Sequence, residues 1–134
     1  MTGVQTCALP ICPIAPDALA GQPLAGRAVL FRTDWSRRWG GEGYFRSGPF
    51  LPPDTCRALV DAGAALVGID CANIDDMADA TRPAHTILLA AGIPLVEHLR
   101  GLDALPATGF RFFAVPPAIA GGTSFTVRAF AIVE

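Results

Sequence analysis

The sequence lacks any run of about 18 apolar residues of the kind that crosses a bilayer. Charged residues, glycines and prolines interrupt every apolar stretch, although 51% of the 134 residues are hydrophobic. It also lacks a basic stripe, because the ten basic residues are scattered and the formal net charge is −2. We therefore expect no membrane and no nucleic acid as partner, and the apolar content predicts one globular unit with a buried core.

Cysteine is scarce, and two of the four cysteines fall in the first twelve residues, MTGVQTCALPIC. This string has no basic residue, and Pro10 and Pro13 break the apolar run over 8–14, which argues against a secretory signal peptide. It resembles a translated sequencing-adapter artefact, which would make residues 1–12 foreign and the natural chain cut upstream. Cys56 and Cys71 then remain without CxxC spacing. We expect no disulfide framework and a cytoplasmic protein.

Local patterns predict an α/β fold, with helices packed on a mixed β-sheet. Residues 13–26 are rich in Pro, Ala and Gly and predict a lead-in loop. Helical spacing of apolar positions, with Pro before and Gly after, predicts helices over 54–63 and 83–91. Segments 33–45 and 71–83 are polar and predict loops. Short apolar runs predict strands over 28–32, 66–69, 93–97, 110–116 and 124–133.

His85 and Glu97 are two potential metal ligands on either side of the second predicted helix. Imidazole and carboxylate are common ligands of hydrolytic divalent metals. A helix of about seven residues rises about 10 Å, and a returning strand of about four residues covers about 13 Å. The two side chains should therefore finish at the same end of the unit, although two ligands alone cannot complete a coordination shell.

Four segments carry a resemblance to a known family: LFRTDWSRRWG, LVGIDCANIDD, RPAHTILLAAGIPLVEHLRGLDALP and GFRFFAVPPAIAGGTSFTVRAFAIV. Together they resemble the C-terminal half of the cyclase family of metal-dependent hydrolases, whose best-known member is bacterial kynurenine formamidase. The most specific part is H-x11-E within HTILLAAGIPLVEHL. The resemblance implies a swivelling β/β/α fold, truncated at its N-terminus, in which His85 and Glu97 bind a divalent metal, zinc or sometimes manganese.

In that family the other metal ligands and the general-base histidine come from an HxGTHxDxPxH-type motif, which this sequence lacks. The resemblance implies hydrolysis of N-formylkynurenine or a related cyclic or acyl amide, as in tryptophan catabolism, by a homo-oligomer. We expect residues 27–134 to be the C-terminal portion of such a hydrolase domain, inactive by itself. Missing strands would leave an apolar edge and face exposed, which predicts aggregation. The alternative is a short non-catalytic binding or oligomerisation domain with structural His85 and Glu97.

An aromatic loop offers a weaker candidate site. Trp35, Trp39 and Tyr44 fall in the polar segment 33–45 and could line a pocket for an aromatic substrate, although packing is the commoner role of such residues. His98 should point to the opposite face from Glu97 if the strand continues, so we assign it a structural or exposed role.

Acidic and thiol groups elsewhere predict no further site. Asp70, Asp75, Asp76 and Asp79 do not follow the EF-hand order, and a solvated loop is expected there, with Asp70 able to organise the site edge. Cys56 is expected in the core, and Cys71 has no neighbouring base that would make it a nucleophile.

Overall fold

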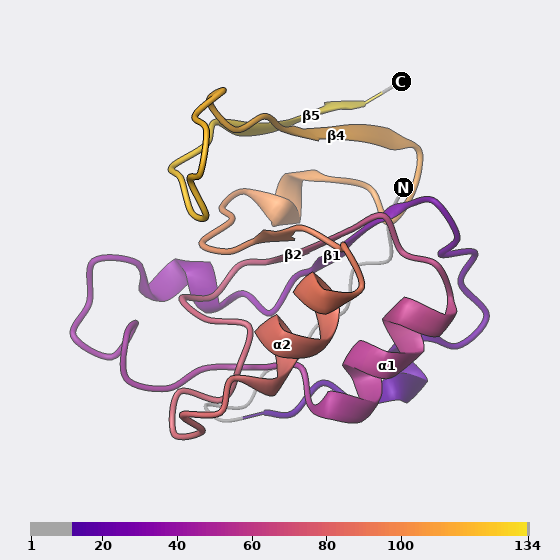
Figure 1. The fold of residues 1–134 in the computed structure, drawn as a ribbon. Helices are drawn as coiled ribbons and strands as arrows, with labels where there is room; N and C mark the ends of the chain where they lie inside the picture. Colours follow the sequence, from indigo (N-terminus) through magenta and orange to yellow (C-terminus); the bar gives the residue numbers. More distant parts are fainter. Residues whose placement is uncertain (1–11, 134) are drawn as a thin grey trace.

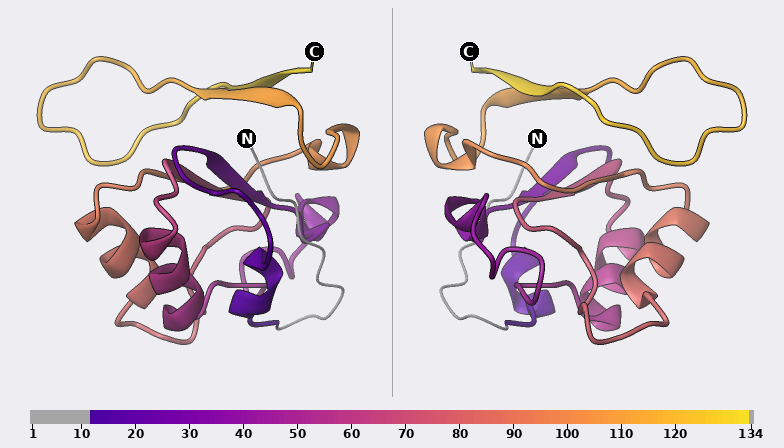
Figure 2. Two further views of the ribbon diagram at one scale, coloured as in Figure 1. Left: turned by 90° about the vertical axis from the view of Figure 1, so that its right-hand side faces the viewer. Right: turned by 90° about the vertical axis from the view of Figure 1, so that its left-hand side faces the viewer.

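A computed structural model of the protein describes residues 12–133 and has three layers (Figure 1). A two-stranded sheet lies above a three-stranded sheet, and two helices cover the other face of the latter (Figures 1 and 2). The expected mixed α/β fold is confirmed. Residues 1–12 were expected to be a foreign string. All of them except residue 12 lie outside the described residues, so this expectation stays a prediction. No helix within 12–133 is long and apolar enough to cross a membrane.

The three-stranded sheet is parallel and its strands follow chain order, β1-β2-β3. Val29 of β1 pairs with Val67 of β2, which in turn pairs with Leu95 of β3. Parallel neighbours need a crossover, and here each crossover contains one α-helix. The elements are β1 (Ala28–Phe31), α1 (Pro53–Asp61), β2 (Leu66–Ile69), α2 (Pro83–Ala90) and β3 (Leu95–Val96).

Proline and glycine set the ends of both helices. Pro53 and Pro83 begin α1 and α2, where the missing N–H group costs nothing because the first turn has no internal acceptor for it. Gly63 and Gly92 follow the helices with φ of 71° and 75°, a left-handed conformation that ends a helix readily at glycine. The two predicted helices are confirmed to within one or two residues at each end.

Two hydrophobic cores lie on opposite faces of the parallel sheet. The main core fills the space between the sheet and the helices, and includes Val67, Leu59 and Leu88, all fully buried. The second core lies between the two sheets and contains Leu30, Leu99, Leu102 and Phe110. The parallel strands are therefore covered on both faces, which matches their continuous apolar sequences.

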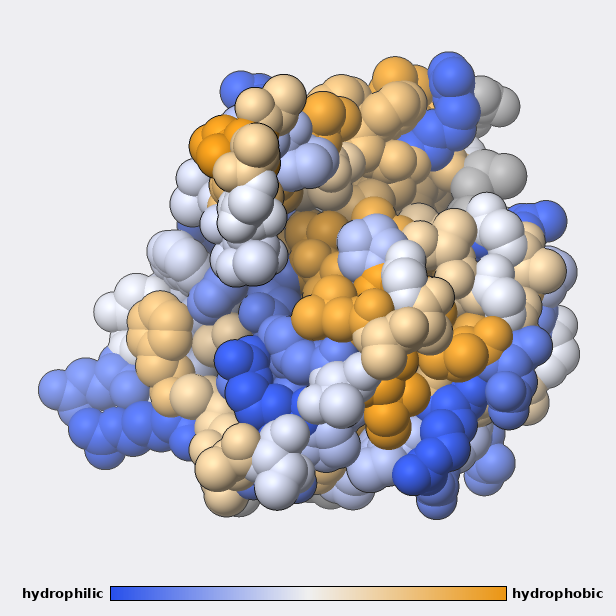
Figure 3. Space-filling view, viewed as in Figure 1, coloured by the Kyte–Doolittle hydropathy of each residue, from blue (hydrophilic) through white to orange (hydrophobic). Residues whose placement is uncertain are grey.

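The second sheet is an antiparallel pair, β4 (Phe110–Ala114) and β5 (Ala129–Val133), joined by the loop 115–128, which extends beyond the body of the molecule (Figure 2). Ala129 and Ala131 pack toward the second core, whereas Phe130 is 46% exposed. Figure 3 shows apolar surface on this sheet and on the body below it.

Several predicted boundaries are wrong. The strand predicted over 124–133 begins only at Ala129, and that predicted over 93–97 is reduced to Leu95–Val96. Pro94 has no N–H group with which to extend the ladder at the start of β3. Short 3-10 turns occupy parts of predicted loops, η1 (Pro16–Leu19) in the lead-in and η2 (Trp35–Arg38) in the aromatic segment. A third turn, η3 (Leu102–Ala104), precedes β4.

Candidate functional site

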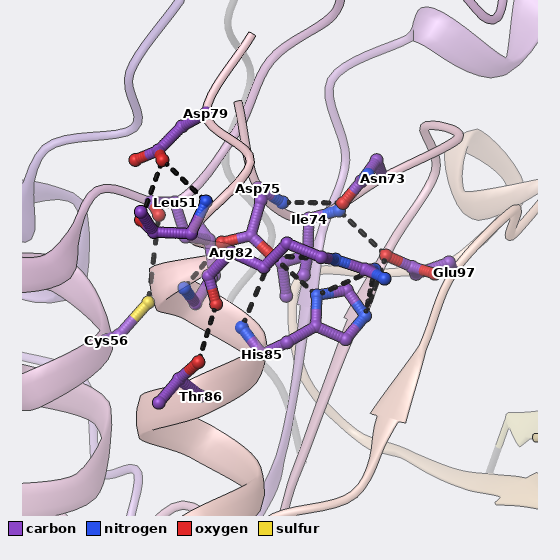
Figure 4. Close-up of polar contacts among 12 residues, drawn as sticks. Leu51, Cys56, Asn73, Ile74, Asp75, Asp79, Arg82, His85, Thr86 and Glu97 are labelled. Atoms are coloured by element: carbon purple, nitrogen blue, oxygen red, sulfur yellow. Dashed lines mark hydrogen bonds and ion pairs between the residues drawn. The ribbon is translucent and has the colours of Figure 1, made fainter. Parts of the chain in front are cut away.

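The structure brings His85 and Glu97 together. His85 lies in the first turn of α2, and Glu97 directly follows β3. The Nε2 atom of His85 lies 3.6 Å from Oε1 of Glu97, and the two side chains are 20% and 23% exposed (Figure 4). The start of the helix and the end of the returning strand thus lie side by side, as their lengths predict.

Asp75 fixes the imidazole of His85. Its Oδ2 atom accepts a hydrogen bond from His85 Nδ1 at 2.6 Å, and its Oδ1 atom accepts one from the backbone N–H of Ala84 at 2.5 Å (Figure 4). The Asp75 side chain is fully buried. The expectation of a solvated loop is wrong for this residue, because the unpaired N–H groups of the first turn of α2 and the imidazole together compensate its burial.

This contact determines which histidine nitrogen is free. When Nδ1 carries the proton donated to Asp75, the lone pair of Nε2 remains available on the side that faces Glu97. Metal-binding histidines commonly donate their other N–H group to a carboxylate in this way, which fixes both the tautomer and the ring orientation. Sequence reasoning missed Asp75, because nothing in a run of acidic loop residues marks the one that reaches the helix.

Glu97 is held from the same loop. Its Oε1 atom accepts the backbone N–H of Ile74 at 2.8 Å. The side chain of Asn73 accepts the N–H of Asp75 at 2.9 Å, which closes a local turn. Loop 71–82 therefore positions both candidate ligands, one through a backbone donor and the other through a buried carboxylate.

Arg82 covers the ring of His85. Its Nη2 atom lies 2.9 Å from Nε2 and 3.2 Å from Nδ1 of the imidazole (Figure 4). A point in the ring plane this close to both nitrogens would overlap the carbon between them, so the guanidinium lies over the face of the ring. Its Nε atom is 3.8 Å from Oδ2 of Asp75.

The donor pair fits one side of a divalent-metal site. Two ligand atoms that each lie about 2.1 Å from a tetrahedral ion are about 3.4 Å apart. The Nε2–Oε1 separation of 3.6 Å is close to that spacing. Within residues 12–133, no group of three or more His, Cys, Asp or Glu residues is arranged to hold a metal ion. The described chain therefore offers two candidate ligands and a carboxylate that orients one of them.

The predicted aromatic residues do not share one environment. Trp35 is buried, and its Nε1–H donates to the carbonyl oxygen of Tyr44 at 3.1 Å. Tyr44 is also buried, which raises the pKa of its hydroxyl to about 12 and keeps it protonated at neutral pH. Trp39 is 47% exposed. A pocket lined by these three residues stays a prediction, and only Trp39 presents much surface to a ligand.

His98 is exposed and packs against this aromatic group, beside Trp39, Tyr44 and Phe45. Its Nδ1 atom lies 3.0 Å from the hydroxyl oxygen of Tyr44. Its backbone has a φ of 59°, so the chain leaves the strand conformation at this residue. The polar contact described for its ring is thus with a tyrosine, in keeping with the structural or exposed role expected for it.

The carboxylate of Asp70 joins the carboxyl ends of β1 and β2. It is almost fully buried, and its Oδ1 atom accepts hydrogen bonds from the backbone N–H of Thr33 at 2.8 Å and from the Thr33 hydroxyl at 2.5 Å. Burial raises its pKa, and the bonds from Thr33 oppose that rise. The expected solvated position is wrong here too, because the donors of Thr33, two residues after β1, compensate the desolvation.

Cys56 and Cys71 are buried and are not disulfide-bonded. The Sγ atom of Cys71 lies 3.1 Å from the carbonyl oxygen of Pro49 and 3.0 Å from that of Asn73. Burial raises the pKa of Cys71 and of Cys56 to about 12 in each case. Neither forms an appreciable amount of thiolate at neutral pH, so neither is suited to act as a nucleophile.

Comparison with known proteins gives consistent matches. The Cyclase family model matches residues 17–76. A kynurenine formamidase of Salinibacter ruber is 40% identical over 79 residues, which cover 59% of this chain and 37% of that protein. An isatin hydrolase of Roseibium aggregatum is 33% identical over 129 residues, covering 87% of this chain and 49% of that protein. The chain thus spans less than half the length of these relatives.

Solved structures agree. An isatin hydrolase bound to the product analogue thioisatinate has a TM-score of 0.90 and 27% identity, over 98% of this chain and 59% of the other. Isatin hydrolase A from Ralstonia solanacearum has a TM-score of 0.80 and the same identity, over 98% and 54% of the two chains. The family match at 17–76 includes Asp70 and Asp75 but ends before His85 and Glu97, whose role as ligands stays a prediction.

Proposed function

This chain covers part of a cyclase-family domain, and on that basis we propose that it provides one side of the divalent-metal centre of an amide hydrolase. The substrate class is an aryl formamide such as N-formylkynurenine, or a cyclic amide such as a lactam, in line with the relatives named kynurenine formamidase and isatin hydrolase. Zinc is the first candidate metal and manganese the second. Homo-oligomeric assembly and a cytoplasmic location belong to the same proposal.

The arrangement of Asp75, His85 and Glu97 carries this proposal. A buried carboxylate holds Nδ1 of the imidazole, and Nε2 faces a second carboxylate at 3.6 Å. A histidine that served only to cap α2 would not need its second nitrogen directed at another acidic group. A structure described as a potential metal-dependent hydrolase with cyclase activity also matches this fold, with a TM-score of 0.78 and 26% identity.

The chemistry divides between the bound ion and the chain. A divalent metal, when bound, lowers the pKa of its water toward about 7 and polarises the carbonyl group under attack. His85 supplies a neutral nitrogen ligand, Glu97 supplies an anionic oxygen ligand, and Asp75 keeps the imidazole in the correct tautomer. The remaining ligands and a general base have to come from outside residues 12–133. We therefore expect no hydrolysis of formylkynurenine by this chain alone.

Manganese broadening of histidine NMR signals tests the metal site directly. The chain has only two histidines, so His85 and His98 give two sets of imidazole resonances. We expect Mn²⁺ to broaden the His85 signals at concentrations that leave those of His98 sharp, and Glu97→Gln to weaken this effect about tenfold, since it removes the anionic ligand. His98→Ala serves as the control and should leave broadening at His85 unchanged.

Two outcomes would contradict the metal site. One is equal broadening of both histidines, which would indicate nonspecific association. The other is selective broadening that survives Glu97→Gln. Either would favour the alternative of a binding or oligomerisation domain, in which Asp75, His85 and Glu97 only join loop 71–82 to α2. That alternative is supported by the partners that these side chains already have within the chain.

A further inference from the structure

Arg82 contacts the candidate ligand His85 in a backbone conformation that arginine seldom adopts. Its φ and ψ of 49° and 58° are left-handed, which costs an L-residue without glycine's freedom about 1 kcal/mol or more. This conformation precedes α2 directly, and the side chain folds back over the imidazole of His85. Strained backbone of this kind tends to occur where a side chain has to be held in a functional position.

Contacts within the chain orient the guanidinium of Arg82 but do not occupy all of its N–H donors. Its Nη2 atom contacts the ring of His85 and its Nε atom lies 3.8 Å from Asp75. Among the contacts described for residues 12–133, Nη1 makes none, and the side chain is 52% exposed. A guanidinium has five N–H donors in a rigid plane, so donors remain for a ligand that approaches from solvent.

Hydrolysis of an amide produces the group that such donors bind best. The oxygen of water bonds to the acyl carbon, the C–N bond breaks, and nitrogen leaves as an amine with one proton from the water. The acyl carbon is left as a carboxylic acid, which releases its proton to the amine or to solvent and becomes a carboxylate. Negative charge develops on the carbonyl oxygen along this path, close to Arg82 if His85 and Glu97 hold the metal.

We propose that Arg82 is the oxyanion-binding residue of this site and that it binds the carboxylate of an acyl product or of a related acid. The inference rests on the proposed function for the identity of the reaction. The fork of parallel N–H groups in arginine matches the two oxygens of a carboxylate, which explains why a planar cation is placed over the histidine. The uncharged amide of the same shape should bind more weakly.

Benzoate and benzamide are matched probes for this property, because they have nearly the same shape and differ in charge. We expect NMR titration of the metal-free chain to show saturable shifts of the His85 ring signals with benzoate and weaker ones with benzamide. Arg82→Gln should reduce affinity for benzoate about tenfold, equivalent to one charge-assisted hydrogen bond, and remove the preference for the acid. Arg82→Lys keeps the charge but loses the planar fork and should give an intermediate loss.

Arg57→Gln is the control for net charge. Arg57 lies on α1 and pairs with Asp54, so its replacement changes total charge equally while leaving the site intact. The proposal is overturned if benzoate and benzamide shift His85 equally, if the preference survives Arg82→Gln, or if Arg57→Gln removes it as well. Should Arg82→Gln fail to fold, unchanged benzoate binding in Arg82→Lys would have the same meaning. Because no metal is present, these results are independent of the manganese experiment.

Discussion

The two sheets of this molecule are built from similarly apolar strands but differ in how those strands are covered. In β2, the side chains of Val67 and Ile69 are fully buried, because helices cover one face of the parallel sheet and the second core covers the other. In β5, Phe130 and Val133 are about half exposed. Apolar composition alone therefore does not distinguish a strand within a core from one that forms an outer surface.

Polar residues sharpen this contrast. Thr33 lies shortly after β1, Asp70 follows β2 and Glu97 follows β3, so all three lie at the carboxyl edge of the parallel sheet. Loops at this edge are the usual location of binding sites in open parallel sheets. The β4–β5 pair contributes none of the contacts around His85. The parallel layer thus contains the candidate site, and the antiparallel layer offers apolar surface.

The largest difference between the two regions should appear in stability. Leu88 is fully buried between α2 and the sheet, so Leu88→Ala should lower the free energy of unfolding by about 2–5 kcal/mol. Phe130 is 46% exposed and stacks on Phe113 with ring centroids 4.9 Å apart. Phe130→Ala should cost only about 0.5–1.5 kcal/mol. Urea denaturation followed by circular dichroism measures both, and equal losses would contradict the comparison.

Local signals explain which parts of this fold the sequence predicts. Pro83 and Gly92 delimit α2 because their backbone preferences act within one turn, and the strand at 66–69 is recognisable from its continuous apolar residues. The proximity of His85 and Glu97 follows from two element lengths. The burial of Asp70 does not, because its partner Thr33 lies 37 residues away in sequence. Asp75 was misassigned for the same reason, since its compensating donors lie nine and ten residues further on.

The start of β5 was missed for a different reason. Residues 124–128 alternate like a strand, yet the ladder with β4 begins only at Ala129, opposite Ala114. An alternating sequence pattern shows only that a segment can form a strand. How long the strand is depends on its partner, and here β4 ends at Ala114. The antiparallel layer was therefore predicted in kind but not in extent.

The exposed face of β5 predicts a second, smaller effect, on association rather than on folding. Phe130 and Ile132 are 46% and 42% exposed on a two-stranded sheet, an arrangement that favours contact between molecules. Replacing both by threonine, which suits strands well, should raise the monomer fraction in size-exclusion chromatography. Because it also removes the stack of Phe130 on Phe113, it should cost about as much stability as Phe130→Ala, about 0.5–1.5 kcal/mol.

Leu89→Thr is the control for this effect. Leu89 is 52% exposed, but it lies on α2 in the parallel region, so its replacement removes a comparable apolar side chain away from the β4–β5 sheet. If it raises the monomer fraction as much as the double substitution, association is not specific to β5. A wild-type chain that is already monomeric and melts cooperatively would contradict the expected aggregation altogether.

The smallest predicted effect is the pH dependence contributed by Asp70, at the edge of the parallel layer. Burial raises the pKa of this carboxyl above its value in the unfolded chain, about 3.9. The folded protein then binds more protons, so its stability is greatest below that value and falls as pH rises through the folded pKa. Asp70→Asn removes the titration and keeps an oxygen to accept the Thr33 hydrogen bonds. The stability of wild type relative to this variant should therefore decrease from about pH 4 upward.

For Asp79, the predicted change of stability with pH has the opposite sign to that for Asp70. Hydrogen bonds from Thr81 lower its pKa, so its contribution is present above the unfolded pKa and is lost as pH falls through the folded one. Relative to Asp79→Asn, wild type should therefore gain stability as pH rises. Urea denaturation of both variants at several pH values gives two slopes to compare. Slopes of the same sign would mean that the hydrogen bonds from Thr33 outweigh the desolvation of the Asp70 carboxyl, so that its pKa is not raised in the folded protein.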